Sequence, residues 1–200
     1  TGLLRSEDRY PPSEQTASCN VDSKSYSYNT GCLCVYQKPN VLICNMNYQE
    51  HENFMDLALE LAERAGKRGE VPVGSVVVYH GKIIGRGANL REEKQDPLAH
   101  AEVIAIREAA AYMGSWRLEE TVLYATLEPC PMCAGAIINA RIPMVVFGCS
   151  DPKAGAVHTL YNLLEDPRLN HRAEVIAGVR SKEASELLTS FFSNLRKNKN

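Results

Sequence analysis

The chain has 200 residues, of which 44% are hydrophobic and 23% are charged. A chain of this length and composition is typical of an ordinary soluble globular protein with one sizeable core. No apolar segment approaches the roughly 20 residues of a membrane-spanning helix, so we expect no membrane partner. The net charge of −2 excludes a general positive field, so any nucleic acid must be held by local basic groups.

Seven cysteines are present, two in one short motif and the others scattered along the chain. An odd number of cysteines in a chain of this size argues against a disulfide framework and for a reducing compartment. We therefore expect a cytoplasmic protein.

The first 45 residues differ in composition from the rest. They are rich in Ser, Pro and Asn and show neither a helical nor an alternating period. Two apolar stretches, at 32–37 and 40–44, could each form a short strand. We predict that residues 1–45 are a poorly ordered N-terminal extension. The working domain is then expected to span residues 46–200, which open with a start-like methionine.

From there on, helices and strands alternate. An apolar stripe and a hairpin come first, and the stripe is formed by Phe54, Leu57, Ala58, Leu61 and Ala65 in a helix ending near Gly66. The hairpin turns at His80-Gly81. Then follow a helix at 100–113, a strand at 121–127, a helix at 131–140, a strand at 142–148, a short helix at 159–165, a strand at 173–179 and a closing helix through 184–195. This order predicts an α/β fold whose mixed sheet has helices on both faces.

Two motifs place metal-binding side chains at the starts of helices. Pro131 suits the first helical position, so Cys130 falls near the N-cap, and Cys133 follows one turn further on the same face. His100 opens the preceding helix. A helix–strand–helix unit can bring two helix N-termini to the same edge of a sheet, so these side chains can meet as His, Cys and Cys ligands.

Three such ligands are typical of a catalytic zinc site, because a structural zinc has four protein ligands and a catalytic one keeps a position for water. Glu102 lies two residues from His100, near that position, where a carboxylate can carry a proton from the water to a substrate nitrogen. We therefore predict one zinc per chain, held by His100, Cys130 and Cys133, with Glu102 as the catalytic residue. A lone His-x-Glu is more often surface chemistry, and a lone C-x-x-C can be redox-active or structural, but their combination favours a zinc hydrolase.

These two motifs carry a family resemblance. HAE at 100–102 and EPCPMCAGAI at 128–137 resemble the signature of the zinc-dependent cytidine and deoxycytidylate deaminase superfamily, whose branches act on several bases. EVPVGSVVV, GRGAN and SWRLEETVLYATL are similar to the tRNA-specific adenosine deaminases of that superfamily, from about Phe54 to Lys197. The resemblance implies a cytidine-deaminase-like three-layer α/β/α fold with a mixed five-stranded sheet. It also implies a homodimer that hydrolyses adenosine to inosine at the wobble position of an arginine tRNA anticodon.

The resemblance further implies how the substrate is held. Glu102 would protonate the adenine ring and the departing ammonia. Contacts with the flipped base, the RNA backbone and a neighbouring base are expected from Val73, Asn89, Ala101, Asp151, Lys153 and Phe192. Ordinary structural roles stay open for several of them: core packing for Val73, and turns for Asn89, Asp151 and Lys153. Phe191 fits the apolar stripe of its helix and is expected in the core.

Two sequence features leave open which residues near the C-terminus contact the RNA. The LNHR motif at 169–172 can serve either RNA binding or the fold. Ser193 follows the paired phenylalanines where many family members carry a basic residue, and Arg196 and Lys197 could supply that charge.

Two alternative functions differ from tRNA deamination. One is a free nucleobase deaminase, such as a guanine deaminase, which would have no use for RNA-binding elements near the C-terminus. The other is a non-catalytic zinc module, which would have no use for Glu102.

Overall fold

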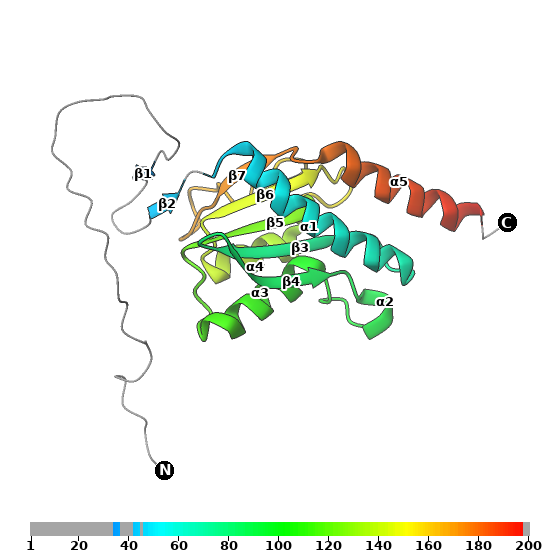
Figure 1. Cartoon of the computed structure of the whole chain (residues 1–200), viewed down its shortest axis with the longest axis horizontal. Helices are drawn as coiled ribbons and strands as arrows, with labels where there is room; N and C mark the ends of the chain where they lie inside the picture. Colours follow the sequence, from blue (N-terminus) through cyan, green and yellow to red (C-terminus); the bar gives the residue numbers. More distant parts are fainter. Residues whose placement is uncertain (1–33, 37–41, 45, 198–200) are drawn as a thin grey trace, which may run out of the picture. The chain divides into compact units, whose positions relative to one another are not determined.

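The computed structural model describes residues 34–36, 42–44 and 46–197 (Figure 1). All of them belong to one compact unit, Cys32–Asn200. Strand β1 (Cys34–Tyr36) pairs in antiparallel fashion with β2 (Leu42–Cys44), so both anticipated short strands are present. The prediction of a poorly ordered extension otherwise concerns residues outside the described ranges.

The main sheet has five strands: β3 (Gly74–Tyr79), β4 (Lys82–Ala88), β5 (Thr121–Leu127), β6 (Met144–Cys149) and β7 (Glu174–Ala177). Their order is β4-β3-β5-β6-β7. Strand β3 is antiparallel to both neighbours, while β5, β6 and β7 are parallel. The predicted mixed five-stranded sheet is therefore confirmed, as is the hairpin turn, where His80 and Gly81 both have positive φ.

Helices lie on both faces of this sheet, as predicted (Figure 1). They are α1 (Tyr48–Lys67), α2 (Arg91–Lys94), α3 (Ala101–Met113), α4 (Pro131–Ala140) and α5 (Ser181–Lys197). Val76 and Val78 of β3 pack in one core with α1 and α5, whereas Val77 packs in the other with α3 and α4. Side chains alternate along a strand, so the three layers follow directly from this pattern. Within the described ranges no helix is long and apolar enough to cross a membrane.

Helix α1 begins earlier than the apolar stripe indicated. Asn47 caps it, and the Glu50 side chain accepts a hydrogen bond from the backbone N–H of Asn47 in return. The buried face is formed by His51, Met55, Ala58, Leu59, Ala62 and Ala65. Placing Leu57 on that face was wrong, since it is 38% exposed. The inner face uses small residues because the helix lies close to β3, where a Cβ at Gly74 would collide with the Ala58 carbonyl oxygen.

Two local predictions differ from the structure. The short helix predicted at 159–165 is absent: the backbone N–H of Leu163 bonds to the carbonyl oxygen of Ala156, not to that of Thr159 four residues earlier as a helix requires. The short helix α2 was not anticipated. Its first N–H groups are satisfied by a carboxylate distant in sequence, that of Glu70.

Glycines in β4 fix the start of α3. A Cβ at Gly85 would collide with the carbonyl oxygen of Ala105, and one at Gly87 with that of Ala101. The backbone of α3 therefore rests directly on the strand. This close packing sets the position of the helix N-terminus, where the first predicted metal ligand lies.

Candidate active site

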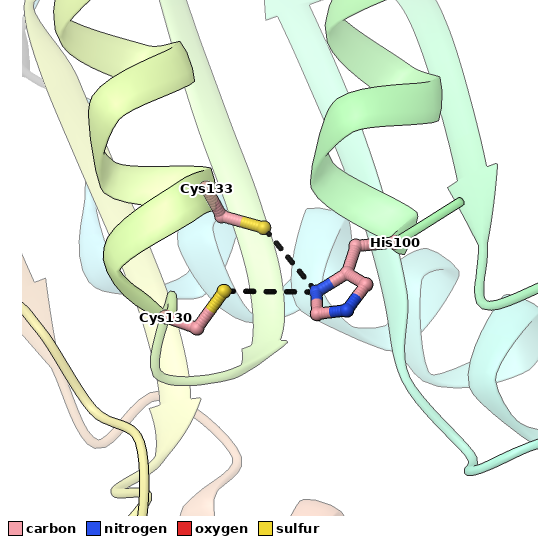
Figure 2. A group of neighbouring side chains, drawn as sticks. All are labelled: His100, Cys130 and Cys133. Carbon is pink, nitrogen blue, oxygen red and sulfur yellow. Dashed lines mark hydrogen bonds between the residues drawn. The ribbon is translucent and has the colours of Figure 1, made fainter. Parts of the chain in front are cut away.

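The predicted metal ligands lie at the starts of two neighbouring helices (Figure 2). His100 is the N-cap of α3, and Cys130 is the N-cap of α4, both with extended backbone. Pro131 occupies the first turn of α4, as expected, and Cys133 lies one turn above Cys130. The His100 side chain makes no hydrogen bond that caps its own helix, and it points towards Cys130 and Cys133.

The spacing of these side chains fits a zinc ion. His100 Nδ1 lies 3.7 Å from Cys130 Sγ and 3.5 Å from Cys133 Sγ, and all three atoms lie within 4.8 Å of one another. Tetrahedral bonds of about 2.3 Å to sulfur and about 2.0 Å to nitrogen place such ligand atoms roughly 3.5 Å apart. No fourth ligand atom joins this group in the part of the chain that the structure describes. The donor set is therefore that of an open, catalytic zinc site.

The environment favours the metal-binding form of one thiol. A hydrogen bond from Cys133, assisted by His100, lowers the pKa of Cys130 to about 4 although burial raises it. The pKa of Cys133 is raised, since it shares a proton with that thiolate. The pKa of His100 is raised by its hydrogen bond to Cys130. A metal ion that binds here displaces the protons that these groups share.

Glu102 lies in the first turn of α3, beside the metal-binding group. It is only 4% exposed, and this burial raises the pKa of its carboxyl group. The charge of His100 and a hydrogen bond with Cys133 offset part of that rise. A raised pKa brings the carboxyl group closer to the pH at which it can both take up and release a proton, which is what an acid–base catalyst requires.

A cavity of about 420 Å³ opens next to these residues. It is lined by His100, Glu102 and Cys130 and by all the predicted substrate contacts: Val73, Asn89, Ala101, Asp151, Lys153 and Phe192. Val73 and Asn89 are buried, whereas Phe192 is 42% exposed and Phe191 is half-buried. Residues from six separate segments thus meet at one cavity, which is large enough for a nucleoside. Their individual roles stay predictions.

Sequence reasoning missed three residues of this site. Arg91, the first residue of α2, lines the cavity. Glu70 is 1% exposed, and its carboxylate accepts hydrogen bonds from Asn89 Nδ2 at 3.4 Å and from the backbone of Glu93 at 2.7 Å. Glu70 therefore connects the cavity residue Asn89 to the start of α2. The only signal in the sequence was an acidic residue directly before an apolar strand.

Glu128 is the third missed residue, although it stands in the EPCPMC motif. It also lines the cavity and is 2% exposed. Burial raises the pKa of its carboxyl group, but hydrogen bonds from Thr159, His158 and Asp151 more than offset this and lower it to about 2. Glu128 is therefore a buried carboxylate that stays charged.

The LNHR motif lies in contacts that hold the fold. Arg141 Nη1 donates to Asn170 Oδ1 at 2.7 Å, and His171 Nε2 bonds to the carbonyl oxygen of Ile142 at 2.8 Å. Neither Asn170 nor His171 lines the cavity, and neither do the basic residues at the end of α5, Arg196 and Lys197.

Comparison with known proteins identifies the class. Residues 48–149 match the model of the cytidine and deoxycytidylate deaminase zinc-binding region. The chain belongs to this family of zinc-dependent deaminases, and its cofactor is zinc.

Relatives within the family are more specific. The chain is 51% identical over 150 residues to the tRNA-specific adenosine deaminase of Bacillus subtilis, covering 75% of this chain and 93% of the relative. It is 47% identical over 149 residues to the protein of the same name from Haemophilus influenzae, covering 74% and 86%.

Solved structures share the fold. A structure from work on A-to-I editing by tRNA:A34 deaminases has a TM-score of 0.66 and 44% identity, covering 68% of this chain and 99% of that one. A guanine deaminase from Nitrosomonas europaea has a TM-score of 0.63 and 22% identity, covering 78% and 89%. The latter likeness shows the fold alone.

Proposed function

We propose that this chain deaminates adenosine to inosine, by hydrolysis, at the wobble position of a tRNA anticodon, with an arginine tRNA as the expected substrate. The observation that carries the proposal is one cavity that joins the metal-binding group to Asn89, Lys153 and the exposed ring of Phe192. A free base needs the first part of this cavity but has no use for an exposed aromatic ring and a lysine around it. Relatives at about half identity that are named tRNA-specific adenosine deaminases support the same substrate.

The reaction replaces the amino group on C6 of adenine by the oxygen of water and releases ammonia. When bound by His100, Cys130 and Cys133, zinc supplies a water molecule that is activated for attack. Residues of the chain transfer the protons. Glu102, buried and with a raised pKa, takes one proton from the attacking water and delivers it to N1 of the ring. It then takes the remaining proton from the new hydroxyl group on C6 and delivers it to the amino group, which leaves as ammonia.

The remaining residues hold the nucleotide in place. Asn89 and Val73 are buried beside Ala101, so they contact the base itself. Asp151 and Lys153 face the sugar and phosphate groups next to it. Phe192 offers a ring face on which a neighbouring unpaired base can stack. We assign this activity to residues 46–200 and expect a cytoplasmic homodimer that binds the anticodon loop.

The proposal is tested by incubating the zinc-loaded protein with an anticodon stem-loop that carries a wobble adenosine. Inosine is read as guanosine after reverse transcription and sequencing. Parallel reactions contain free guanine, free cytosine and adenosine, and a stem-loop with guanosine at the wobble position is the control. Efficient deamination of free guanine with no inosine in the RNA would contradict the proposal and favour the free-base alternative.

A further inference from the structure

The loop between β6 and β7 is folded around a single carboxylate. The carboxylate of Glu128 accepts backbone N–H bonds from Asp151 at 3.0 Å, Val157 at 3.1 Å, His158 at 2.7 Å and Thr159 at 2.9 Å. The Thr159 hydroxyl donates to it as well. Five donors on two oxygens use all of the about four lone-pair sites of a carboxylate. Four backbone N–H groups of the loop thus have one side chain, that of Glu128, as their hydrogen-bond acceptor.

Among the described residues, no Lys, Arg or His side chain forms an ion pair with the Glu128 carboxylate. A buried charge is costly unless hydrogen bonds stabilise it, and here the stabilising dipoles come from the loop alone. The conformation of the loop and the charge of Glu128 therefore depend on each other.

The conformation of the loop also shows that it depends on the Glu128 carboxylate. Residues 150–173 contain no helix or strand. A Cβ at Gly155 would collide with the carboxyl group of Glu128, so the loop closes directly on that group. The side chain of Asp151 accepts hydrogen bonds from the backbone of Lys153 at 2.9 Å and Ala154 at 3.2 Å, which fixes the turn next to the carboxylate.

This turn forms one side of the cavity. Asp151, Lys153 and Glu128 all line it, and Glu128 is separated from the ligand Cys130 by Pro129 alone. The Pro129 carbonyl oxygen accepts a hydrogen bond from Ala156 of the loop at 2.9 Å. Glu128 and Pro129, which lead into the metal-binding helix α4, thus also form the hydrogen bonds that hold the loop.

We propose that Glu128 is a positioning residue for RNA binding, which holds Asp151 and Lys153 at the distance from the zinc site that the sugar–phosphate groups around the target nucleotide require. This inference rests on the proposed function and deepens it. Glu128 itself transfers no proton and binds no metal. Its effect is on the affinity for RNA, through the loop.

The first test is Glu128→Gln in the zinc-loaded chain, assayed with the wobble-adenosine stem-loop. Glutamine keeps the size but lets only one of its two terminal atoms accept, so part of the loop loses its partner. We expect KM to rise about tenfold, the size of one lost hydrogen bond to a charged group. The value of kcat and the zinc content should stay close to those of the unchanged chain. A fall in kcat at constant KM, or a loss of zinc, would overturn the inference.

A double-substitution cycle tests whether Glu128 acts through Lys153. Lys153→Ala should raise KM in the unchanged chain but have little further effect in the Glu128→Gln background, because the lysine is already displaced there. If the two effects multiply, Glu128 does not act through Lys153, and that part of the proposal is wrong. A role in general stability alone would also give independent effects.

Two further measurements keep the test decisive if the glutamine variant folds poorly. Thr159→Val removes one donor and should raise KM by about threefold, whereas Thr121→Val removes a buried hydroxyl far from the cavity and should leave KM unchanged. Amide hydrogen exchange of residues 151–159 should be faster in Glu128→Gln and Thr159→Val, with α3 and α4 unaffected. This readout does not need RNA. Inactivity of the unchanged chain on the stem-loop would refute the proposed function, whereas unchanged exchange would refute the positioning role.

Discussion

The two sides of the cavity are built on different principles. On the chemical side, His100, Cys130 and Cys133 sit at the starts of two helices that rest on the sheet. On the binding side, Asp151 and Lys153 come from a loop without helix or strand, and Phe192 comes from α5. The first side is fixed by secondary structure, and the second by tertiary contacts. Changes on the first side should abolish the reaction for any substrate, whereas changes on the second should alter the preference for RNA over a nucleoside.

Contacts between residues far apart in the sequence fix the positions of the elements on the binding side. Arg180, just before α5, pairs with Asp56 at 2.8 Å and with Glu52 at 3.1 Å, both on α1. These ion pairs orient the helix that carries Phe192. Glu128 has the corresponding role for the loop, so each binding element is held by a residue from another part of the chain.

The largest effect is expected for the chemical side. Cys130→Ala combined with Cys133→Ala removes both sulfur ligands, so we expect loss of bound zinc and of all turnover. Metal analysis after dialysis measures this directly. Cys149→Ala is the matched control, because Cys149 is also buried but bonds to the carbonyl oxygen of Thr126, so this variant should keep the bound zinc. Stoichiometric zinc in the double variant would show that the ligands are elsewhere.

The next effect separates catalysis from metal binding. Glu102→Gln should keep the fold and the zinc but lower kcat by about a hundredfold to ten-thousandfold, as loss of a general acid–base does. Adenosine and RNA should be affected alike. Glu108→Gln on the same helix is the control, since its carboxylate bonds to the backbone of Arg86 outside the cavity. Loss of zinc from the Glu102 variant alone would make this residue a ligand.

The chemical side could be predicted from the sequence because its information is local. Pro131 fixed the helix start, the spacing of Cys130 and Cys133 fixed their common face, and the strand between the helices fixed the shared edge. The binding side was only partly predictable. Its residues were assigned by resemblance, and the structure brings them to one cavity, but no periodicity marks the carboxylates of Glu70 and Glu128 that hold them. Their roles arise from backbone donors between 22 and 31 positions away.

The fold shows the same division. The strand predicted at 121–127 and the helix predicted at 131–140 match β5 and α4 to their ends. The helix predicted at 159–165 was wrong because the backbone of this segment bonds back to the earlier part of the loop, as Leu163 does to Ala156, and no local pattern reveals that partner. Leu57 was misplaced because the face of α1 that meets the sheet is selected by close approach to Gly74, which favours alanine over leucine.

A smaller and more selective effect is expected on the binding side. Phe192→Ala removes the ring on which a base can stack, and stacking is worth about 1–3 kcal/mol per base, so RNA turnover should fall roughly ten- to a hundredfold. Slow turnover of free adenosine should not change. Leu195→Ala is the control, because Leu195 is 40% exposed on the same helix but lies outside the cavity lining. An equal loss for RNA and nucleoside would place Phe192 on the chemical side.

The smallest effect concerns a group on neither side of the cavity. His51 of α1 is buried, and its Nδ1 lies 2.9 Å from the hydroxyl of Tyr124. Burial lowers the pKa of His51 below its ordinary value of 6.5, although Glu50 partly offsets this. The unfolded chain therefore binds a proton near pH 6.5 that the folded chain does not, so the free energy of unfolding should decrease as the pH falls through that value.

The check is denaturant unfolding at about pH 7.5 and about pH 5.5 of the unchanged chain and of His51→Asn. Asparagine retains a polar atom near the position of Nδ1 but does not titrate, so the variant should lose less stability on acidification. Both proteins carry the same zinc ligands, so release of the metal at low pH affects them equally and cancels in the comparison. The ratio of RNA turnover to nucleoside turnover should be the same in both, because His51 lies on the α1 face of the sheet and contributes to neither side of the cavity. An equal loss of stability in both proteins would show that His51 is not the group that titrates, and a shift in the turnover ratio would show that the α1 face is coupled to RNA binding.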